Sequence, residues 1–139
     1  MRLHITKNFH INEFKCPCCG VANISEEFVE HLQRLRDIYG EPIYITSGYR
    51  CPEYNRQIGG YYKSPHLTGK AVDIVTELKP VTMAYMADDL EVFRIGIYRG
   101  HIHLDILEPR PSKYWLVKSG NVTYSRNIKE LNEFLRGVN

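Results

Sequence analysis

The chain has 139 residues, a usual size for one compact domain with its own hydrophobic core. Lys and Arg total 18 and Asp and Glu total 16, so the net charge is only +2. This balance argues against nucleic acid as the main partner, because phosphate binding requires clustered cations. No apolar run approaches the length that spans a bilayer, and the N-terminal residues lack the apolar core of a signal peptide. We therefore expect no membrane insertion and a protein that is cytoplasmic as synthesised.

Helical and strand patterns alternate along the chain, with turn residues between them. Ser25 is a typical N-cap, and apolar residues follow it at helical spacing until Gly40 ends the run. Two later strands are separated only by Arg99-Gly100, which predicts an antiparallel hairpin. In chain order, the patterns predict a helix over 26–39, a strand over 43–46, a short helix over 52–58, a strand over 71–75, a helix over 79–90, hairpin strands over 93–98 and 102–107, strands over 114–117 and 122–124, and a helix over about 127–135.

Helices are thus predicted early and late in the chain, with most strands between them. We expect an α+β fold with a small, largely antiparallel sheet flanked by helices. The expected single domain covers residues 1–139. Its motif-bearing part lies at about 8–107, and the sequence does not tell what a C-terminal extension over 108–139 contributes beyond closing the core.

Four cysteines occur, three in the run Cys16-Pro17-Cys18-Cys19 and the fourth at Cys51. Disulfides are not expected without export, so metal binding and plain burial are the competing interpretations. A four-thiolate zinc site would use all four residues, but the C-x-C-C spacing differs from the familiar C-x-x-C knuckle. We therefore favour partly buried thiols without a metal.

The residues best suited to chemistry lie in the stretch from Ser64 to Asp73 and in the later run from His101 to Asp105. Imidazole and carboxylate groups from two separate segments are what a zinc ion requires, because one short peptide cannot surround the ion. Three protein ligands leave one position for water, which distinguishes a catalytic site from a structural one. Taken singly, His66 and Asp73 would be a loop histidine and a strand-end aspartate with local hydrogen bonds.

Strand alternation sharpens the choice of residues. In the later strand the two histidines and the aspartate face one side, and the intervening isoleucine and leucine residues face the other. In the earlier strand Asp73 lies opposite to Val72 and Ile74. Gly69 permits the bend that would return His66 toward Asp73.

The string S-x-H-x-x-G-x-A-x-D from Ser64 to Asp73, followed by His103 and Asp105, resembles the zinc D-Ala-D-Ala carboxypeptidase family. That family includes the vancomycin-resistance D-Ala-D-Ala dipeptidases and the phage L-alanyl-D-glutamate endolysins, and its short phage and prophage members are the most similar. The resemblance extends over about 8–107 and includes Ser47-Gly48-Tyr49-Arg50-Cys51-Pro52. It implies a Hedgehog/DD-peptidase-like fold and a Zn²⁺ cofactor.

Carried over by position, the resemblance implies that zinc is bound by His66, Asp73 and His103. It also implies that Arg50 binds a carboxylate or carbonyl of the peptide, a role that suits its planar fork. Arg50 follows a predicted strand end, where sites are commonly built. A surface ion pair with Glu53 is the alternative for this arginine.

The general base is not fixed by the resemblance. The endolysins and the dipeptidases place a glutamate three residues before the final histidine, where this chain has Gly100. His101 and Asp105 are the candidates, and we favour His101 as base or transition-state stabiliser and Asp105 as the group that orients a ligand. His101 is interpreted equally well as an ordinary polar residue at a turn. Ser64 is expected to cap its own loop rather than to contact substrate.

These inferences predict a zinc metallopeptidase that hydrolyses bacterial cell-wall peptides, with peptidoglycan-derived peptide as the partner. The resemblance to phage members suggests release to the cell wall by a lysis or tail system. The alternative is a metal-stabilised domain that binds peptide or cell wall without cutting it, as the missing glutamate and the Hedgehog similarity permit. A Cys-rich domain for nucleic acid is disfavoured by the even charge distribution.

Overall fold

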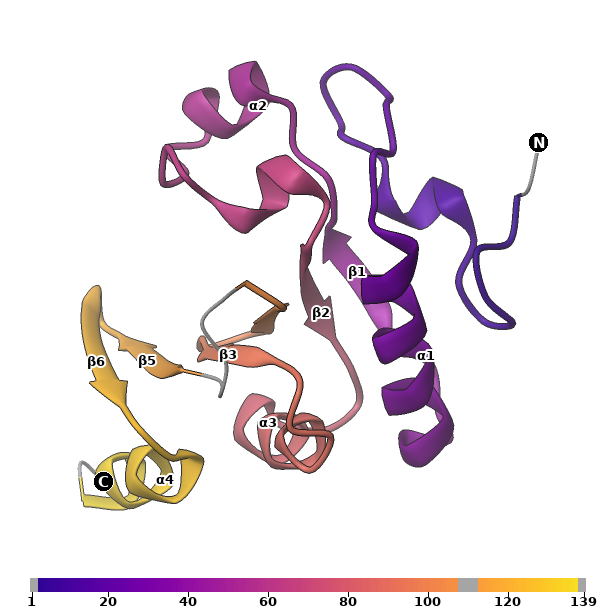
Figure 1. Ribbon diagram of the computed structural model, residues 1–139. Helices are drawn as coiled ribbons and strands as arrows, with labels where there is room; N and C mark the ends of the chain where they lie inside the picture. Colours follow the sequence, from indigo (N-terminus) through magenta and orange to yellow (C-terminus); the bar gives the residue numbers. More distant parts are fainter. Residues whose placement is uncertain (1–2, 108–112, 138–139) are drawn as a thin grey trace.

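The structure is a computed structural model that describes residues 3–107 and 113–137 (Figure 1). Its elements, with η for a short 3-10 helix, are η1 (Ile11–Phe14), α1 (Glu26–Tyr39), β1 (Tyr44–Ser47), α2 (Pro52–Gln57), η2 (Pro65–Thr68), β2 (Ala71–Val75), α3 (Pro80–Asp88), β3 (Arg94–Ile97), β4 (Ile102–Asp105), β5 (Tyr114–Lys118), β6 (Asn121–Ser125) and α4 (Ile128–Gly137). Each predicted helix and strand is present within two residues at either end. The two 3-10 helices do not follow from the sequence pattern, and residues 108–112 of the expected extension lie outside the described part.

Helix α1 shows how local signals set the ends of an element. The Ser25 hydroxyl accepts a hydrogen bond from the Phe28 N–H at 3.2 Å, which satisfies one of the free donors of the first turn. Gly40 ends the helix in the left-handed conformation and donates its N–H to the Arg36 carbonyl at 2.9 Å. The face between these caps is buried in the core through Phe28, Val29, Leu32 and Leu35.

Six strands of the described residues form one sheet in the order β1-β2-β4-β3-β5-β6. Neighbouring strands are antiparallel, except that β3 and β5 run parallel. β4 and β5 lie on opposite sides of β3 and run in opposite directions. The sheet is therefore mixed, whereas the sequence predicted a largely antiparallel one. Helices flanking a sheet remain compatible with the α+β class.

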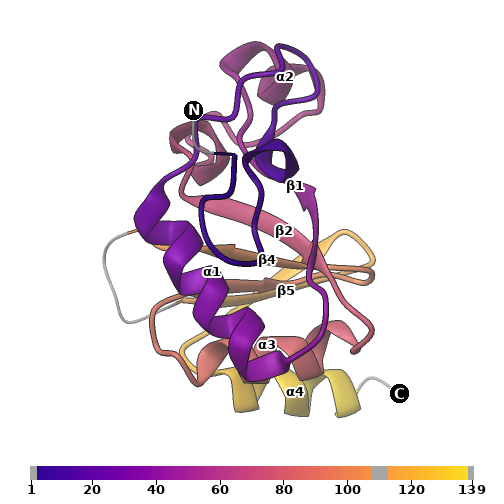
Figure 2. The same ribbon diagram turned by 90° about the vertical axis from the view of Figure 1, so that its right-hand side faces the viewer.

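The two faces of the central strands differ in character. Val72, Ile74, Ile102 and Leu104 alternate along β2 and β4, are at most 1% exposed, and pack into the core with α1 and α3. Asp73 and His103 occupy the intervening positions, so strand alternation turns them to the opposite face. Figures 1 and 2 both show α3 and α4 at one end of the molecule and α2 at the other.

The C-terminal strands continue the same sheet. β5 pairs with β3 and β6 pairs with β5, while α4 contributes the buried residues Ile128 and Leu131 to the core. The extension therefore does more than close the core, because it also enlarges the sheet that carries the polar residues. In the described part of the chain, no helix has the length and apolar character needed to cross a membrane.

Candidate functional site

Three potential metal donors converge at the polar face of the sheet. Asp73 of β2 and His103 of β4 are direct cross-strand partners, and Nδ1 of His103 lies 3.1 Å from Oδ1 of Asp73. His66 of η2 places its Nε2 atom 3.5 Å from the same carboxylate oxygen. The three donor atoms all lie within 4.8 Å of one another. The structure thus brings together the three residues for which the sequence predicted a metal site.

The histidine of η2 is held by its own loop. The Ser64 hydroxyl accepts a hydrogen bond from the His66 N–H at 3.2 Å, so the predicted capping role of Ser64 is confirmed. Gly69 adopts a φ of 69°, and a Cβ there would lie 2.0 Å from the carbonyl oxygen of Asn23. Only glycine fits both the backbone conformation and the close approach, and the resulting bend directs η2 toward β2 as expected.

Hydrogen bonding fixes which nitrogen of His66 faces the cluster. Nδ1 lies 2.8 Å from the Gly48 carbonyl oxygen, to which it can only donate a proton. Nε2 is then the acceptor nitrogen, and it is buried without a hydrogen-bond partner among the described residues. A buried, unpaired imidazole nitrogen beside a carboxylate is the arrangement expected of a metal ligand whose other nitrogen is held by a carbonyl.

His103 is oriented in the same manner by a carboxylate. Its Nε2 atom lies 2.8 Å from Oδ2 of Asp105, a side chain with no exposed surface. Asp105 is also 3.4 Å from Nε of Arg94 and accepts a hydrogen bond from the Leu107 N–H at 3.1 Å. Because its oxygens are occupied in this way, Asp105 is placed to position His103 rather than to exchange protons with a substrate.

The neighbouring groups shift the pKa values of two members of the cluster. Burial alone would raise the pKa of Asp73, but the adjacent imidazoles of His103 and His66 hold it well below its usual range. Burial would lower the pKa of His103, but its hydrogen bonds to Asp105 and Asp73 raise it instead. His103 therefore lies between the carboxylates of Asp73 and Asp105. The donor set itself consists of two imidazoles and the Asp73 carboxylate, which is a set that a divalent ion such as zinc binds.

Arg50 lies beside the cluster but is turned toward one of its members. Its Nη2 atom is 3.3 Å from Oδ2 of Asp73, Nη1 donates to Oδ1 of Asn55 at 3.2 Å, and Nε donates to the Ser47 hydroxyl at 3.1 Å. The alternative of a surface pair with Glu53 is not what the structure shows. Arg50 orients the Asp73 carboxylate and still carries further N–H groups on its two terminal nitrogens.

His101 lies at the rim of the same cleft. Its ring stacks on Tyr98, with centroids 4.4 Å apart and an interplanar angle of 10°. Burial of the ring lowers the pKa of His101, so the imidazole is neutral near pH 7 and is able to accept a proton. Gly100, the residue before it, is an exposed turn residue with open space around it.

The three clustered donors line one cleft of about 750 Å³, together with the side chains of Arg50, His101 and Asp105. Sequence reasoning missed part of its wall, because Trp115 of β5 and Tyr124 of β6 also line it. The Trp115 ring packs against His103 with centroids 5.3 Å apart. It fits there because its partner in β3 is Gly96, where a Cβ would lie 2.4 Å from the indole. The remaining lining residues are Arg50, Gly60, Tyr61, Ser64, Pro65, His66, Asp73, Arg94, Tyr98, His101, His103 and Asp105.

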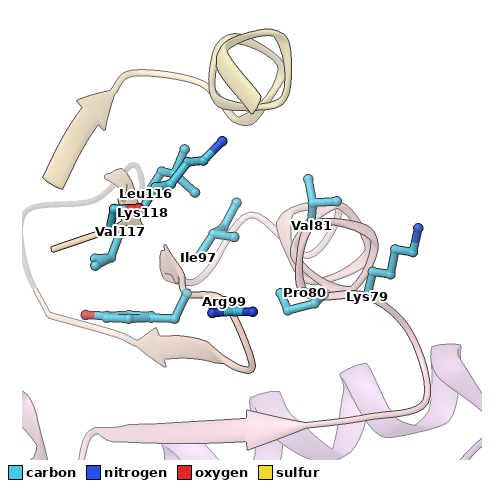
Figure 3. Close-up of a pocket in the computed structure, with 10 residues that line it drawn as sticks. Lys79, Pro80, Val81, Ile97, Arg99, Leu116, Val117 and Lys118 are labelled. Atoms are coloured by element: carbon cyan, nitrogen blue, oxygen red, sulfur yellow. The ribbon is translucent and has the colours of Figure 1, made fainter. Parts of the chain in front are cut away.

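A second cavity, of about 650 Å³, lies between α3, β3 and β5 (Figure 3). Its wall is mainly apolar and includes Pro80, Val81, Ile97 and Leu116. None of its lining residues carries a carboxylate or an imidazole, so this cavity supplies no metal donors. Of these two cavities, the first cleft is therefore the one lined by metal donors.

Comparison with known proteins agrees with this geometry. Residues 7–105 match the family model described as peptidase M15, which covers more than half of the chain and includes all the site residues named above up to Asp105. A search of curated proteins finds no match.

Proposed function

The chain belongs to the peptidase M15 family, whose members are zinc-dependent metallopeptidases, and on this premise we propose that its substrate is the peptide part of bacterial peptidoglycan. The observation that carries the proposal is the convergence of His66, Asp73 and His103 at the floor of an open cleft. The resemblance of the Ser64 to Asp73 string to D-Ala-D-Ala carboxypeptidases supports a cell-wall peptide with D-amino acids and a Hedgehog/DD-peptidase-like fold. The resemblance to phage endolysins supports delivery by a lysis or tail system.

In this proposal His66, Asp73 and His103 would hold the zinc ion through Nε2, Oδ1 and Nδ1, respectively. The unpaired Nε2 of His66 and the tautomer fixed by the Gly48 carbonyl support this assignment. A zinc ion with three protein ligands acts as a Lewis acid on a carbonyl and lowers the pKa of water to about 7.

The other residues of the cleft have distinct roles. Arg50 holds the second oxygen of Asp73 and directs its remaining N–H groups at a carbonyl or carboxylate of the peptide. Asp105 fixes the ring of His103 through Nε2. His101 accepts a proton from the attacking water and returns it to the leaving amine, since its imidazole is neutral near pH 7 and lies on the cleft wall.

A second candidate is a metal-stabilised domain that binds peptide without cutting it. The observation in its favour is that both carboxylates of the cleft, Asp73 and Asp105, are engaged with His103, and Gly100 adds no third one. Proton transfer then depends on His101 alone. Hydrolysis therefore has to be measured separately from binding.

The deciding experiment incubates the zinc-loaded protein with purified peptidoglycan and with an acyl-D-Ala-D-Ala peptide. We expect new amino termini to be released by the wild type and not by His66→Ala. His31→Ala removes a partly buried histidine of α1 outside the cleft and serves as the matched control, with expected activity close to wild type. Binding of peptidoglycan without release of amino termini, by protein with confirmed zinc content, would establish the second candidate instead.

A further inference from the structure

A second cluster of metal-binding side chains lies outside the cleft. The Sγ atoms of Cys16, Cys19 and Cys51 all lie within 4.8 Å of one another, although Cys51 is far from the other two in sequence. All four cysteines of the chain are free thiols. The fourth cysteine, Cys18, lies between Cys16 and Cys19 in the same run.

The backbone around these sulfurs is arranged to stabilise thiolates. Cys51 donates its N–H to Sγ of Cys16 at 3.4 Å, and Tyr54 donates its N–H to Sγ of Cys51 at the same distance. Hydrogen bonds of this kind favour the charged form of the sulfur, which is the form that binds metals.

A tight turn sets the spacing between the first two ligands. Gly20 donates its N–H to the Cys16 carbonyl at 2.9 Å, and Cys16 donates its own N–H to the Val21 carbonyl at 2.8 Å. Gly20 has a φ of 73°, so this turn folds the chain back directly after Cys19. Cys16 and Cys19 form a C-x-x-C pair, a spacing that the interposed Cys18 conceals in the sequence.

We propose that Cys16, Cys19 and Cys51, with Cys18 as the fourth ligand, bind a structural zinc ion. Tetrahedral zinc with Zn–S bonds of about 2.3 Å requires sulfurs about 3.8 Å apart, so small side-chain rotations bring the three clustered sulfurs into place. A disulfide would use two of these sulfurs and leave the others unpaired. Three sulfurs at mutual reach, with N–H donors to two of them, fit a soft metal ion better than one covalent pair.

The ion would connect the N-terminal segment to the loop that carries Arg50, which lines the cleft. Cys51 directly follows Arg50, and the Gly48 carbonyl that holds His66 lies three residues before it. This loop already rests on the N-terminal segment, because Tyr49 donates its N–H to the Phe14 carbonyl at 3.0 Å. A metal ion bound by residues 16–19 and by Cys51 would hold this loop on the C-terminal side of Arg50, whereas the Tyr49 hydrogen bond holds it on the N-terminal side. The two attachments together would position Arg50.

Cobalt substitution tests the proposal independently of catalysis. The metal-free full chain is titrated with Co²⁺, and thiolate-to-cobalt charge-transfer absorption reports the cysteine site alone, since the cleft has no sulfur donor. We expect about two metal ions per wild-type chain and about one in His66→Ala, with the thiolate absorption unchanged. Cys51→Ser and Cys19→Ser should lose the absorption and keep the ion in the cleft.

Two further measurements make the result decisive. Cys18→Ser should weaken cobalt binding at the thiolate site at least about tenfold, and unchanged affinity would remove Cys18 from the ligand set.

In the His66→Ala background, zinc should slow hydrogen exchange of the Tyr49 amide. Absence of the charge-transfer absorption in wild type, its loss in His66→Ala, or a disulfide found by mass mapping of the purified chain would overturn the proposal. Cys19 is exposed, so its variant tests the site even where replacement of buried Cys16 disturbs folding.

Discussion

The chemistry of the cleft depends on which nitrogen each histidine presents. His66 turns Nε2 toward Asp73 because Nδ1 is held by the Gly48 carbonyl, whereas His103 turns Nδ1 toward the same carboxylate because Nε2 is held by Asp105. The sequence motif predicted that these residues lie together, which the structure shows, but it could not reveal this choice. The partners that determine it lie elsewhere in the chain or depend on ring orientation, which spacing does not encode.

Replacing Asp105 by Asn tests the positioning of His103. The amide is isosteric but lacks the charge that strengthens the 2.8 Å contact with Nε2, so we expect zinc affinity of the cleft to fall about tenfold to a hundredfold while the fold is retained. Competition with a chromophoric chelator measures the affinity. Asp89→Asn, an exposed change outside the cleft, is the control and should leave affinity unaltered. Equal affinities in the two variants would exclude a positioning role for Asp105.

At the scale of elements, the loop that carries His66 depends on a glycine in a crowded place. Gly69 and Gly40 have similar positive φ values, 69° and 77°, but a Cβ meets the Asn23 carbonyl at 2.0 Å only at Gly69. Gly40→Ala should therefore cost only the conformational strain, about 1–2 kcal/mol. We expect Gly69→Ala to cost clearly more than this in chemical denaturation and to weaken zinc binding as well. Similar losses in the two variants would mean that the loop relaxes without disturbing η2.

Strands β5 and β6 supply the second prediction at this scale. Trp115→Ala removes the ring that packs against His103 and lies 5.6 Å from the Arg94 guanidinium, an aromatic contribution of about 0.5–1.5 kcal/mol. We expect peptide affinity to fall about two- to tenfold, as measured by KM or by a binding titration. Trp115→Phe keeps an aromatic ring and should retain most of the affinity. A KM that is unchanged in the alanine variant would place the substrate elsewhere in the cleft.

Local patterns predicted the elements well because the signals that form them are local. The Ser25 cap, the Gly40 stop and the alternation in 102–105 all act within a few residues, and the structure confirms each of them. The parallel pairing of β3 with β5 depends instead on strand order across the sheet, which periodicity does not specify. A glycine within a strand, such as Gly96, signals that another group approaches the backbone closely. Nothing in the sequence identified that group as the Trp115 ring.

For the whole molecule, the proposed zinc ligands join η2 to the neighbouring strands β2 and β4 of the sheet. An ion that binds only the folded chain adds stability, by about 2.7 kcal/mol when its free concentration is a hundred times its Kd. We expect a chelator to lower the unfolding temperature of the wild type, and zinc to restore it. The zinc-dependent change in unfolding temperature is measured for wild type and for His66→Ala. The difference between these two changes is the contribution of the ion in the cleft. Identical zinc-dependent shifts in the two proteins would show that the cleft ion does not stabilise the fold.

The position of Trp115 in the chain separates the proposed metal donors from part of the cleft wall. Residues up to Asp105 precede β5, so every donor atom of the proposed centre lies ahead of the indole that borders it. A product truncated after Leu107 would keep the ion-binding side chains, leave β3 with an unpaired edge, and present His103 to solvent. Ion binding and the aromatic wall of the groove are thus encoded in separate parts of the chain.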